Sequence, residues 1–526
     1  MTSESYKKVS EAPTRPVQRE RKVKFDVAEL YEGPLASGAE APSAAISLDE
    51  KLRQAYFWIT NNAIISPFYD IEYNTTAPQV YRMGDQKVNV TLPSDQSYSS
   101  YVLLPLLNLA VRRRCLLVGG PGRGKTAIAI LLGVLSGYSL RDIKRAIQHG
   151  QPQMTIADLL GNPLPSSMVN AQSNADIKIA WRSWLSMRVR IIDEYNRIPT
   201  RTQSALLTVM ADNYAEMYDQ IFECPEAAWY LTANDEAGGG TYQVIEALRD
   251  RIDVVVRAFH FNTRFLGELL TRIENNIRPE TVVPKQIIFN EEELSRAEEE
   301  IRAVRFPPEL LKRLEFFASH FEFFEPAALQ IEYMTKDTVK LAGMELRTLR
   351  SEETGKDQLA DLGSQTLNGL SVRALMTCII CIKALAYFRG MHEVGLEDLR
   401  QIIPFVLHDK LVINSDSPFF EQKGNAPLRV DRISWIRNLF DLSCREYERL
   451  DLDRGDPLKP LDQEFAKGLE GVNESQVRQQ LVQIERILRG WSSSRKLYGH
   501  LFDDILKLKY LHQRYTNYLR WLQWKG

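Results

Sequence analysis

The sequence predicts an α/β fold, with a parallel sheet covered by helices on both faces, followed by an all-helical region. Short apolar runs alternate with helical segments, which is typical of the central strands of a parallel sheet; they are Cys115–Val118, Val189–Ile192, Ala228–Ala233 and Ile252–Val256. From about residue 305 onward the strand signals disappear and helical periodicity replaces them. The chain has 526 residues, which at about 150 residues per domain predicts three or four structural units.

Composition and charge exclude several classes of protein. Hydrophobic residues make up 44% and charged residues 25% of the chain, which is ordinary for a soluble globular protein and argues against a mainly disordered one. A net charge of −2 argues against bulk nucleic acid as the main partner. There is neither a run of about 18 apolar residues for a membrane span nor an apolar signal-peptide core at the N-terminus, so we expect a cytoplasmic protein. The five cysteines are expected to be reduced thiols.

The segments before the predicted sheet differ in character. Residues 1–46 are rich in Lys, Arg, Glu, Pro, Ala and Ser without an apolar period, which predicts a flexible N-terminal arm, with a docking arm as the alternative. Ser47 and Glu50 have the spacing of a capping box, so a helix is expected to begin there. With short strands and turns at 64–98, residues 47–98 form a helix-and-strand prelude.

A glycine-rich loop after the first apolar run predicts a nucleotide site. It fits the G-x-x-x-x-G-K-[ST] pattern between a strand and a helix, and we expect its backbone N–H groups to curl around a phosphate at a helix N-terminus. Lys125 can reach the β- and γ-phosphates, and Thr126 can ligate Mg²⁺. The expected ligands are therefore ATP and Mg²⁺, bound by Gly119, Gly120, Pro121, Gly122, Arg123, Gly124, Lys125, Thr126 and Ala127.

Two carboxylates follow the second apolar run. Asp193 is placed to hold Mg²⁺, and Glu194 is placed to orient the attacking water, because phosphoryl transfer mainly requires positioning and charge neutralisation. The alternative is an acidic pair that caps the next helix.

The residues from Asp193 to Pro199, with Arg201–Leu207 after them, resemble the MoxR family of AAA+ ATPases, in the helix-2-insert clade. Further segments that resemble this family follow in its order: Asp158–Gly161, Glu246–Ile252, Gly369–Ala374, Phe388–Gly390 and Glu397–Arg400. The resemblance covers roughly residues 100–412. It implies an AAA+ P-loop αβα core at 99–262, linker helices at 263–304 and a helical lid at 305–412 with an insertion around 335–365.

The resemblance also assigns roles. Asn234 would be sensor 1, which helps to hold the attacking water, although Asp235 stands where the family usually has Pro and a glycine run (Gly238–Gly240) follows. Arg251 would be the arginine finger that reaches a neighbouring subunit's nucleotide, with Arg249 as the alternative, and Arg373 would be sensor 2 on the lid. Planar guanidinium groups match the charged oxygens of a transferring phosphate.

Two insertions occupy positions where this clade places substrate-engaging loops. Residues 162–181 correspond to the helix-2 insert and residues 212–227 to the pre-sensor hairpin. Their apolar residues could contact a client segment, or they could belong to ordinarily packed hairpins.

Cys378 and Cys381 have the C-x-x-C spacing of some metal sites, but the apolar helix around them predicts that they are buried in the core.

Residues 413–526 lie beyond the resemblance. Val477, Leu481, Ile484 and Leu488 are spaced by four, three and four residues, and Leu501–Leu522 carries a similar stripe. This periodicity predicts a helical C-terminal extension built on a hairpin of two long helices.

Taken together, these motifs predict a MoxR-like AAA+ ATPase, a hexameric ring that couples ATP hydrolysis to remodelling or chaperone-like activation of a protein client. The resemblance implies a partner with a von Willebrand factor A domain. The alternatives are a nucleic-acid-stimulated motor or defence-system component, which the near-neutral charge argues against, and a weakly hydrolysing nucleotide-switched scaffold, which the intact Asp193, Glu194 and Asn234 argue against.

Overall fold

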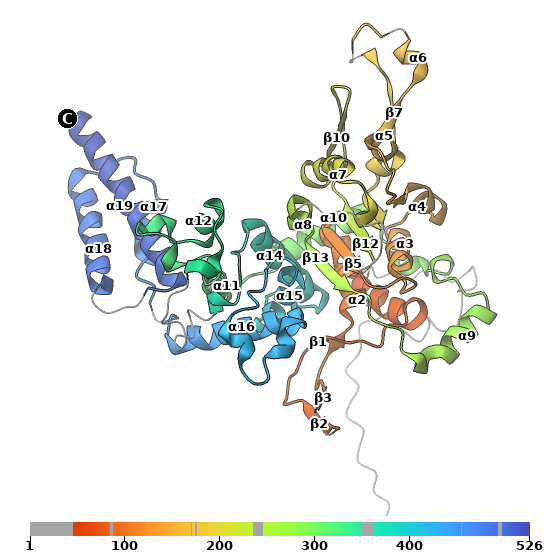
Figure 1. Ribbon diagram of the computed structural model, residues 1–526, viewed down its shortest axis with the longest axis horizontal. Helices are drawn as coiled ribbons and strands as arrows, with labels where there is room; N and C mark the ends of the chain where they lie inside the picture. The colour runs from red at the N-terminus through yellow and green to blue at the C-terminus, as the bar shows by residue number, and fades with distance from the viewer. Residues whose placement is uncertain are drawn as a thin grey trace, which may run out of the picture.

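A computed structural model describes residues 46–84, 88–169, 171–173, 176–234, 246–349, 362–453, 455–492 and 497–525. The predicted arm lies outside these ranges except for residue 46, and so do Asp235 and Gly238–Gly240. The α/β core carries two projecting hairpins, the helical lid lies beside it, and the C-terminal helices form the far end of the molecule (Figure 1). Within the described ranges, no helix combines the length and apolar character needed to cross a membrane.

The core is the predicted parallel sheet, with five strands in the order β13-β5-β12-β9-β6. Every residue of β12 is buried, and because successive side chains point to opposite faces, both faces of the sheet must be covered. Sequence analysis missed β6, which has only two residues. The strands are β5 (Arg114–Val118), β6 (Gln148–His149), β9 (Val189–Asp193), β12 (Ala228–Ala233) and β13 (Val254–Arg257).

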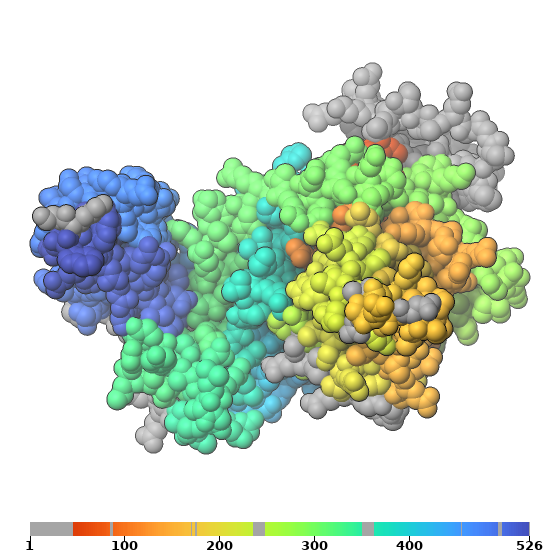
Figure 2. Space-filling view, turned by 90° about the horizontal axis from the view of Figure 1, so that it is seen from above, coloured from red at the N-terminus to blue at the C-terminus, as the bar shows by residue number. Residues whose placement is uncertain are grey.

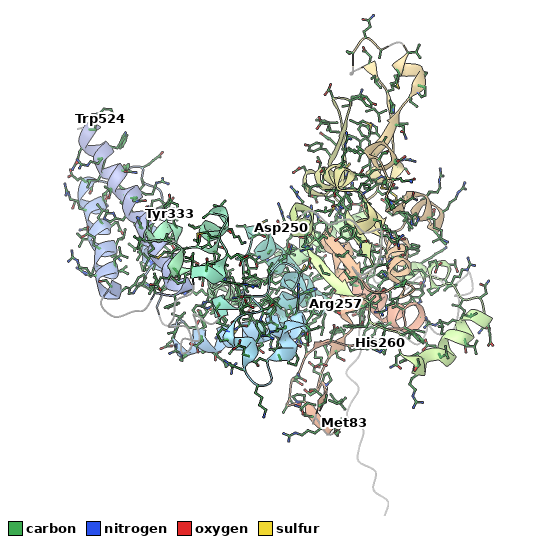
Figure 3. The ribbon with its side chains drawn as sticks, in the orientation of Figure 1. Met83, Asp250, Arg257, His260, Tyr333 and Trp524 are labelled. Atoms are coloured by element: carbon green, nitrogen blue, oxygen red, sulfur yellow. The ribbon has the colours of Figure 1, made fainter. Side chains whose placement is uncertain are left out.

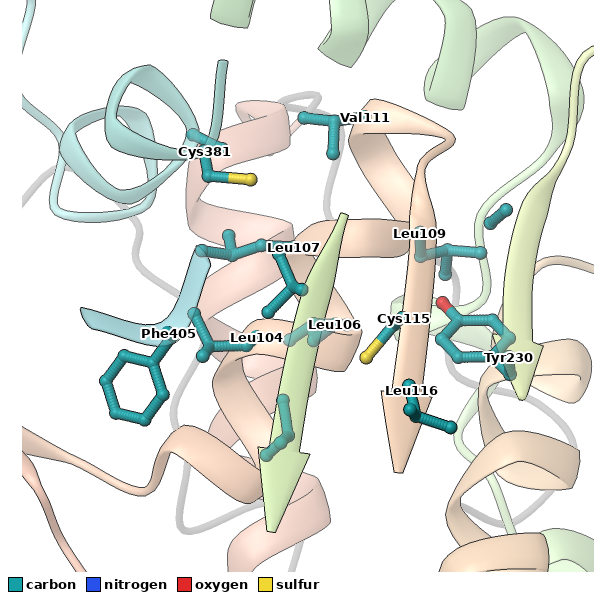
Figure 4. Close-up of a cluster of buried hydrophobic side chains, with 14 of the residues drawn as sticks. Leu104, Leu106, Leu107, Leu109, Val111, Cys115, Leu116, Tyr230, Cys381 and Phe405 are labelled. Carbon is teal, nitrogen blue, oxygen red and sulfur yellow. The ribbon is translucent and has the colours of Figure 1, made fainter. Parts of the chain in front are cut away.

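Helices pack against this sheet and join it to the lid. Helix α2 (Ser100–Val111) is buried along its whole length and packs against β5, β12 and β13, as expected for a helix that is apolar all round. Its leucines meet Cys115 and Tyr230 of the sheet on one side and Cys381 and Phe405 of the lid on the other (Figure 4). The core also contains α3 (Lys125–Leu135), α4 (Leu140–Ala146), α5 (Ile156–Leu160) and α7 (Thr200–Asp212).

The prelude consists of α1 (Leu48–Trp58), which continues into a π-helical turn at Ile59–Ala63, and two antiparallel strand pairs. The helix begins directly after Ser47, as predicted, but the Ser47 side chain makes no cap hydrogen bond, so the capping box itself does not form. The helix is held instead by an ion pair of 2.8 Å between Lys51 and Glu293. The strand pairs are β1 (Ile71–Glu72) with β4 (Ser97–Tyr98), and β2 (Gln79–Met83) with β3 (Val88–Leu92).

The lid is helical, as predicted. Helix α16 lies beyond its predicted end at residue 412, but it packs on α11 and α15, and its Trp435 and Phe440 belong to the main buried core. Cys378 and Cys381 are buried in the same core, as expected. The lid helices are α11 (Pro308–Ser319), α12 (Lys336–Leu341) in the predicted insertion, α14 (Val372–Phe388), α15 (Leu396–Leu407) and α16 (Arg432–Arg449). Before them, α9 (Leu266–Glu274) and α10 (Glu291–Ala303) lie in the segment predicted as linker helices.

The C-terminal extension has a small core of its own. Helices α17 (Lys459–Ala466), α18 (Glu474–Ser492) and α19 (Gly499–Lys525) share a cluster of buried apolar residues that includes Val477, Ile484, Leu508, Leu511 and Tyr515. Helices α18 and α19 lie along each other as a hairpin (Figure 1). Aromatic contacts attach α19 to the lid: the ring of Phe502 lies 5.0 Å from that of Phe323, so the hairpin is anchored to α11 and the segment after it.

Candidate active site

The glycine-rich loop joins the carboxyl end of β5 to the amino end of α3, as predicted. Gly124 has a φ of +77°, a left-handed conformation that favours glycine, and it directly precedes the helix. At Gly119 an added Cβ would lie 2.5 Å from the carbonyl oxygen of Ala258, so no side chain fits there. The loop therefore has the shape in which backbone N–H groups can surround a phosphate.

Lys125 is nearly fully buried and connects the loop to Asn234. Its Nζ donates to the carbonyl oxygens of Gly119 (2.6 Å) and Gly120 (2.8 Å) and to Oδ1 of Asn234 (3.0 Å). The Nδ2 atom of Asn234 in turn donates to Oε1 of Glu194 at 2.7 Å. Three residues that lie far apart in the chain thus form one continuous hydrogen-bonded series at the carboxyl edge of the sheet.

Asp193 is the centre of a second set of contacts. Its Oδ1 accepts from the hydroxyls of Thr126 (2.8 Å) and Thr232 (2.6 Å), and Nδ1 of His149 lies 3.3 Å from its Oδ2. Hydroxyl and carboxylate oxygens are the ligand chemistry that Mg²⁺ prefers, so Thr126 and Asp193 fit the predicted metal. Sequence analysis missed Thr232 and His149, although each lies at or next to the carboxyl end of a strand beside β9.

Glu194 is held in an uncommon backbone conformation. It has a φ of +52°, which is rare for a residue with a Cβ and is concentrated at functional sites. Its N–H donates to Oγ1 of Thr232 (2.9 Å), and its Oε2 lies 3.2 Å from Nε of Arg197. The side chain caps no helix and faces Asn234 instead, so the alternative interpretation of an acidic cap is wrong for this residue.

The two predicted finger residues lie at the opposite edge of the sheet. Helix α8 (Glu246–Arg251) ends just before β13, and the N–H of Asp253 donates to the carbonyl of Arg114 at the start of β5. Because β5 and β13 are parallel, Arg249 and Arg251 stand at the amino edge, whereas the phosphate loop follows the carboxyl edge. The five residues of β5 span roughly 16 Å, which separates both arginines from the phosphate loop of their own chain.

Arg373 lies with these arginines and not with Lys125. Its Nη1 makes an ion pair with Oδ2 of Asp250, whose Oδ1 accepts from Ser371 at 3.1 Å. Lys410 donates to the backbone carbonyls of Asp250 (3.0 Å) and Ile252 (2.7 Å), and burial lowers its pKa. The first turn of α14 is therefore fastened to the end of α8, near Asp250 in Figure 3.

Comparisons with known proteins agree with this arrangement. The profile of the ATPase family associated with various cellular activities matches residues 114–254, and that of the AAA lid domain matches residues 364–433. The chaperone MoxR1 of Mycobacterium tuberculosis is 25% identical over 314 residues, which cover 59% of this chain and 71% of that protein. Together these matches support a MoxR-family AAA+ ATPase.

Among solved structures, a provisionally assigned ATPase of Cytophaga hutchinsonii aligns with a TM-score of 0.44 and 18% identity, covering 64% of this chain and 88% of that one. The match to the lid profile extends to residue 433 and so reaches into α16, in line with the packing of that helix on α15.

The two predicted insertions form hairpins on one side of the α/β core, and Figure 2 looks down onto them. The first contains β7 (Gly161–Pro163), α6 (Pro165–Met168) and β8 (Ile179–Trp181); the second contains β10 (Tyr214–Met217) and β11 (Gln220–Glu223). Near their bases Trp181 packs on Phe222, with ring centroids 5.4 Å apart. Toward the ends the apolar side chains are exposed, with Val169 at 84% and Ile221 at 65%. Ordinary packing therefore accounts for Trp181 and Phe222 but not for Val169 and Ile221.

Proposed function

We propose that the chain hydrolyses ATP with the residues at the carboxyl edge of its sheet. The observation that carries this proposal is the hydrogen-bonded series Lys125–Asn234–Glu194 beside the Thr126–Asp193 pair. The glycine-rich loop and Lys125 bind the phosphates, Glu194 orients and polarises the attacking water, and Asn234 helps to hold it. Mg²⁺ held by Thr126 and Asp193 neutralises phosphate charge when it is bound.

The proposal includes a homo-hexameric ring with shared active sites. Arg251 and Arg373 occupy the amino edge of the sheet, so they act on a nucleotide bound by the neighbouring subunit, with Arg249 as the alternative finger. A contact between one edge of a subunit and the opposite edge of the next is heterologous, the kind of contact that generates a ring when the rotation between subunits closes. Support for Arg251 over Arg249 comes from its buried Nε, which makes no hydrogen bond within the described part of the chain, whereas Nε of Arg249 lies 3.9 Å from Asp409.

The ring would act on a protein client and recruit a partner. The exposed apolar residues at the hairpin ends, which include Met168, Val169, Tyr218 and Ile221, contact the client segment. From the resemblance to the MoxR family we also infer that the ring works with a partner that carries a von Willebrand factor A domain. The C-terminal helices provide a recruitment surface that ends in Trp521 and Trp524, the latter 91% exposed, since exposed aromatics commonly anchor partners. All five cysteines are free thiols, which supports a location of this protein in the reducing cytoplasm.

Identification of the client tests this function. A Glu194→Gln chain should bind ATP without turnover, remain assembled and retain its client, which can be identified after purification. ATPase stimulation by the recovered protein, compared with single-stranded and duplex DNA, then separates a protein remodeller from a nucleic-acid motor. Stimulation by DNA alone would contradict the remodelling function, and a basal turnover indistinguishable from that of Lys125→Ala would favour the switched scaffold.

A further inference from the structure

The β2–β3 hairpin of the prelude projects from the core, and within the described residues it is a sheet of two strands only (Figure 1). Every residue of both strands is exposed. In an antiparallel pair, residues that lie opposite each other share a face, and successive residues alternate between the two faces. The register therefore places five apolar side chains on one face, with exposed fractions from 41% to 58%: Tyr81, Met83, Val88, Val90 and Leu92.

The opposite face of the hairpin is mainly polar. It carries Arg82 opposite Asn89 and Val80 opposite Thr91. An isolated two-stranded hairpin is only marginally stable in water, and a contiguous exposed apolar patch commonly marks an interaction site. A further segment is therefore expected to pack on the face that carries Met83, whose side chain lies at the end of the hairpin away from the core (Figure 3).

Helix α1, where the described part of the chain begins, is joined to the base of this hairpin. On α1, Nη1 of Arg53 donates to the carbonyl oxygen of Phe388 at 2.7 Å. The guanidinium carbon of the next residue, Arg389, lies 3.7 Å from the centroid of the Tyr73 ring. Tyr73 precedes β2, and its N–H donates to the carbonyl oxygen of Gln96, which follows β3, at 2.7 Å. The chain before α1 therefore starts close to the hairpin base.

We propose that residues 23–31 of the same chain pack on the apolar face of the β2–β3 hairpin. These residues lie outside the described ranges, and they hold a concentration of large apolar side chains: Val23, Phe25, Val27, Leu30 and Tyr31. The segment from there to α1 consists mostly of Gly, Pro, Ala and Ser. Its roughly 15 residues reach up to about 50 Å, whereas strands of five residues are about 17 Å long.

This inference favours the docking interpretation of the N-terminal arm, and it does not depend on the proposed ATPase activity. The occupant comes from the same chain because the arm starts near the hairpin base, has the length to reach the whole face and carries the apolar side chains that the face lacks. Packing of these side chains removes apolar surface of both partners from water, which stabilises the pair.

Cleavage of the full chain by trypsin tests whether the arm is held. Lys24 lies within the proposed segment, and Lys8 lies in the arm outside it. Val90→Ser should raise the rate of cleavage after Lys24 about tenfold, because one buried apolar contact is lost and cleavage follows the population of the open form. Cleavage after Lys8 should not change. Val80→Ser, on the opposite face of the same hairpin, is the matched control and should leave both rates unchanged.

Hydrogen exchange tests the same contact from the side of the arm. Val27→Asp places a charge against the apolar face, so the backbone amides of β3 should exchange about tenfold faster or more. Val17→Asp changes the arm outside the proposed segment and is the control, with no expected effect on β3. These substitutions lie outside the hairpin, so they keep the test valid even if Val90→Ser unfolds it.

A disulfide identifies the chain that supplies the segment. Phe25→Cys combined with Val90→Cys should form a disulfide within one chain on oxidation, whereas Phe25→Cys with Val80→Cys should not. A disulfide that forms only between chains, in a mixture of the two single variants, would show that a second copy supplies the segment and would overturn the proposal. Equal rates of cleavage after Lys24 in the wild type, Val90→Ser and Val80→Ser, with unchanged exchange in Val27→Asp, would overturn it as well.

Discussion

The Nζ atom of Lys125 donates a hydrogen bond of 3.0 Å to Oδ1 of Asn234. The same ammonium group also donates to the carbonyl oxygens of Gly119 and Gly120, in the loop whose backbone N–H groups are expected to surround a bound phosphate. A nucleotide that engages Lys125 must therefore compete with Asn234 for it. Because Asn234 also donates to Glu194, two hydrogen bonds connect Lys125 to the residue that we propose orients the attacking water.

The first prediction separates binding from hydrolysis. Lys125→Ala should abolish or greatly weaken ATP binding, because the loop loses its phosphate-facing ammonium. Glu194→Gln should bind ATP but not hydrolyse it, since the amide cannot polarise the attacking water. Equilibrium binding and phosphate release are the measurements. Normal phosphate release by Glu194→Gln would refute the assigned role of this carboxylate.

The second prediction concerns the shared site. Arg251→Ala should lower hydrolysis by about 10³-fold or more and leave ATP affinity largely intact, because the guanidinium serves the nucleotide of a neighbour. Arg373→Ala should also act on turnover more than on affinity. Phosphate release, ATP affinity and particle mass are measured together. Arg296→Ala, an exposed arginine on α10 in an i,i+4 pair with Glu300, is the control and should behave as wild type.

Mixing Arg251→Ala with Lys125→Ala should restore part of the activity, because each chain supplies what the other lacks at one class of interface. If mixed rings stay inactive and Arg249→Ala alone reproduces the defect, the finger is Arg249. A chain that sediments as a monomer with ATP at all concentrations would contradict the shared site altogether.

The third prediction concerns the C-terminal helices. A chain truncated after residue 454 retains α16, and with it Trp435 and Phe440 of the main core. It loses the helices that share a separate core, together with the contact of Phe502 on Phe323 of the lid. ATP binding should therefore persist, while partner-dependent stimulation of turnover should be lost. Trp521→Ala with Trp524→Ala in the full chain should reproduce the loss of stimulation without exposing Phe316 and Phe323 of the lid. A soluble truncated chain that cannot bind ATP would show that the extension is needed for the nucleotide site.

The fourth prediction is a pH dependence of stability. Burial lowers the pKa of His320 from 6.5 to about 3, and neither ring nitrogen has a hydrogen-bond partner among the residues that the structure describes. The folded chain therefore binds fewer protons than the unfolded one between these values, so the free energy of unfolding falls as the pH drops below 6.5. At 1.36 kcal/mol per pH unit, the loss reaches about 2 kcal/mol at pH 5.

His320→Leu removes this titration and should show a shallower decline in the free energy of unfolding, measured by urea denaturation at several pH values. His392→Leu, at an exposed histidine, is the control and should keep the slope of the wild type. Parallel pH profiles for His320→Leu and the wild type would mean that His320 is not held neutral in the folded state.

Much of the site could be predicted from the sequence because its signals are local. A strand, a glycine-rich turn and Lys125 are consecutive, and Asp193 and Glu194 directly end another strand, so their chemistry follows from a few adjacent residues. Thr232 and His149 could not be assigned in this way. A threonine in a strand and a histidine at the end of a two-residue strand carry no signal until β6 and β12 lie on either side of β9.

The sequence by itself determined the order of the main elements and the positions of the glycine-rich loop, Lys125 and the two carboxylates at the ends of their strands. Only the tertiary structure decided that Arg373 joins Asp250 at the amino edge of the sheet while Lys125 joins Asn234 and Glu194 at the carboxyl edge. The physical reason is the separation along the chain over which each kind of interaction acts. Periodicity and turn chemistry act over a few residues, whereas these pairings depend on strand order and on how the lid packs against α8, which are set by burial of apolar surface across the whole chain.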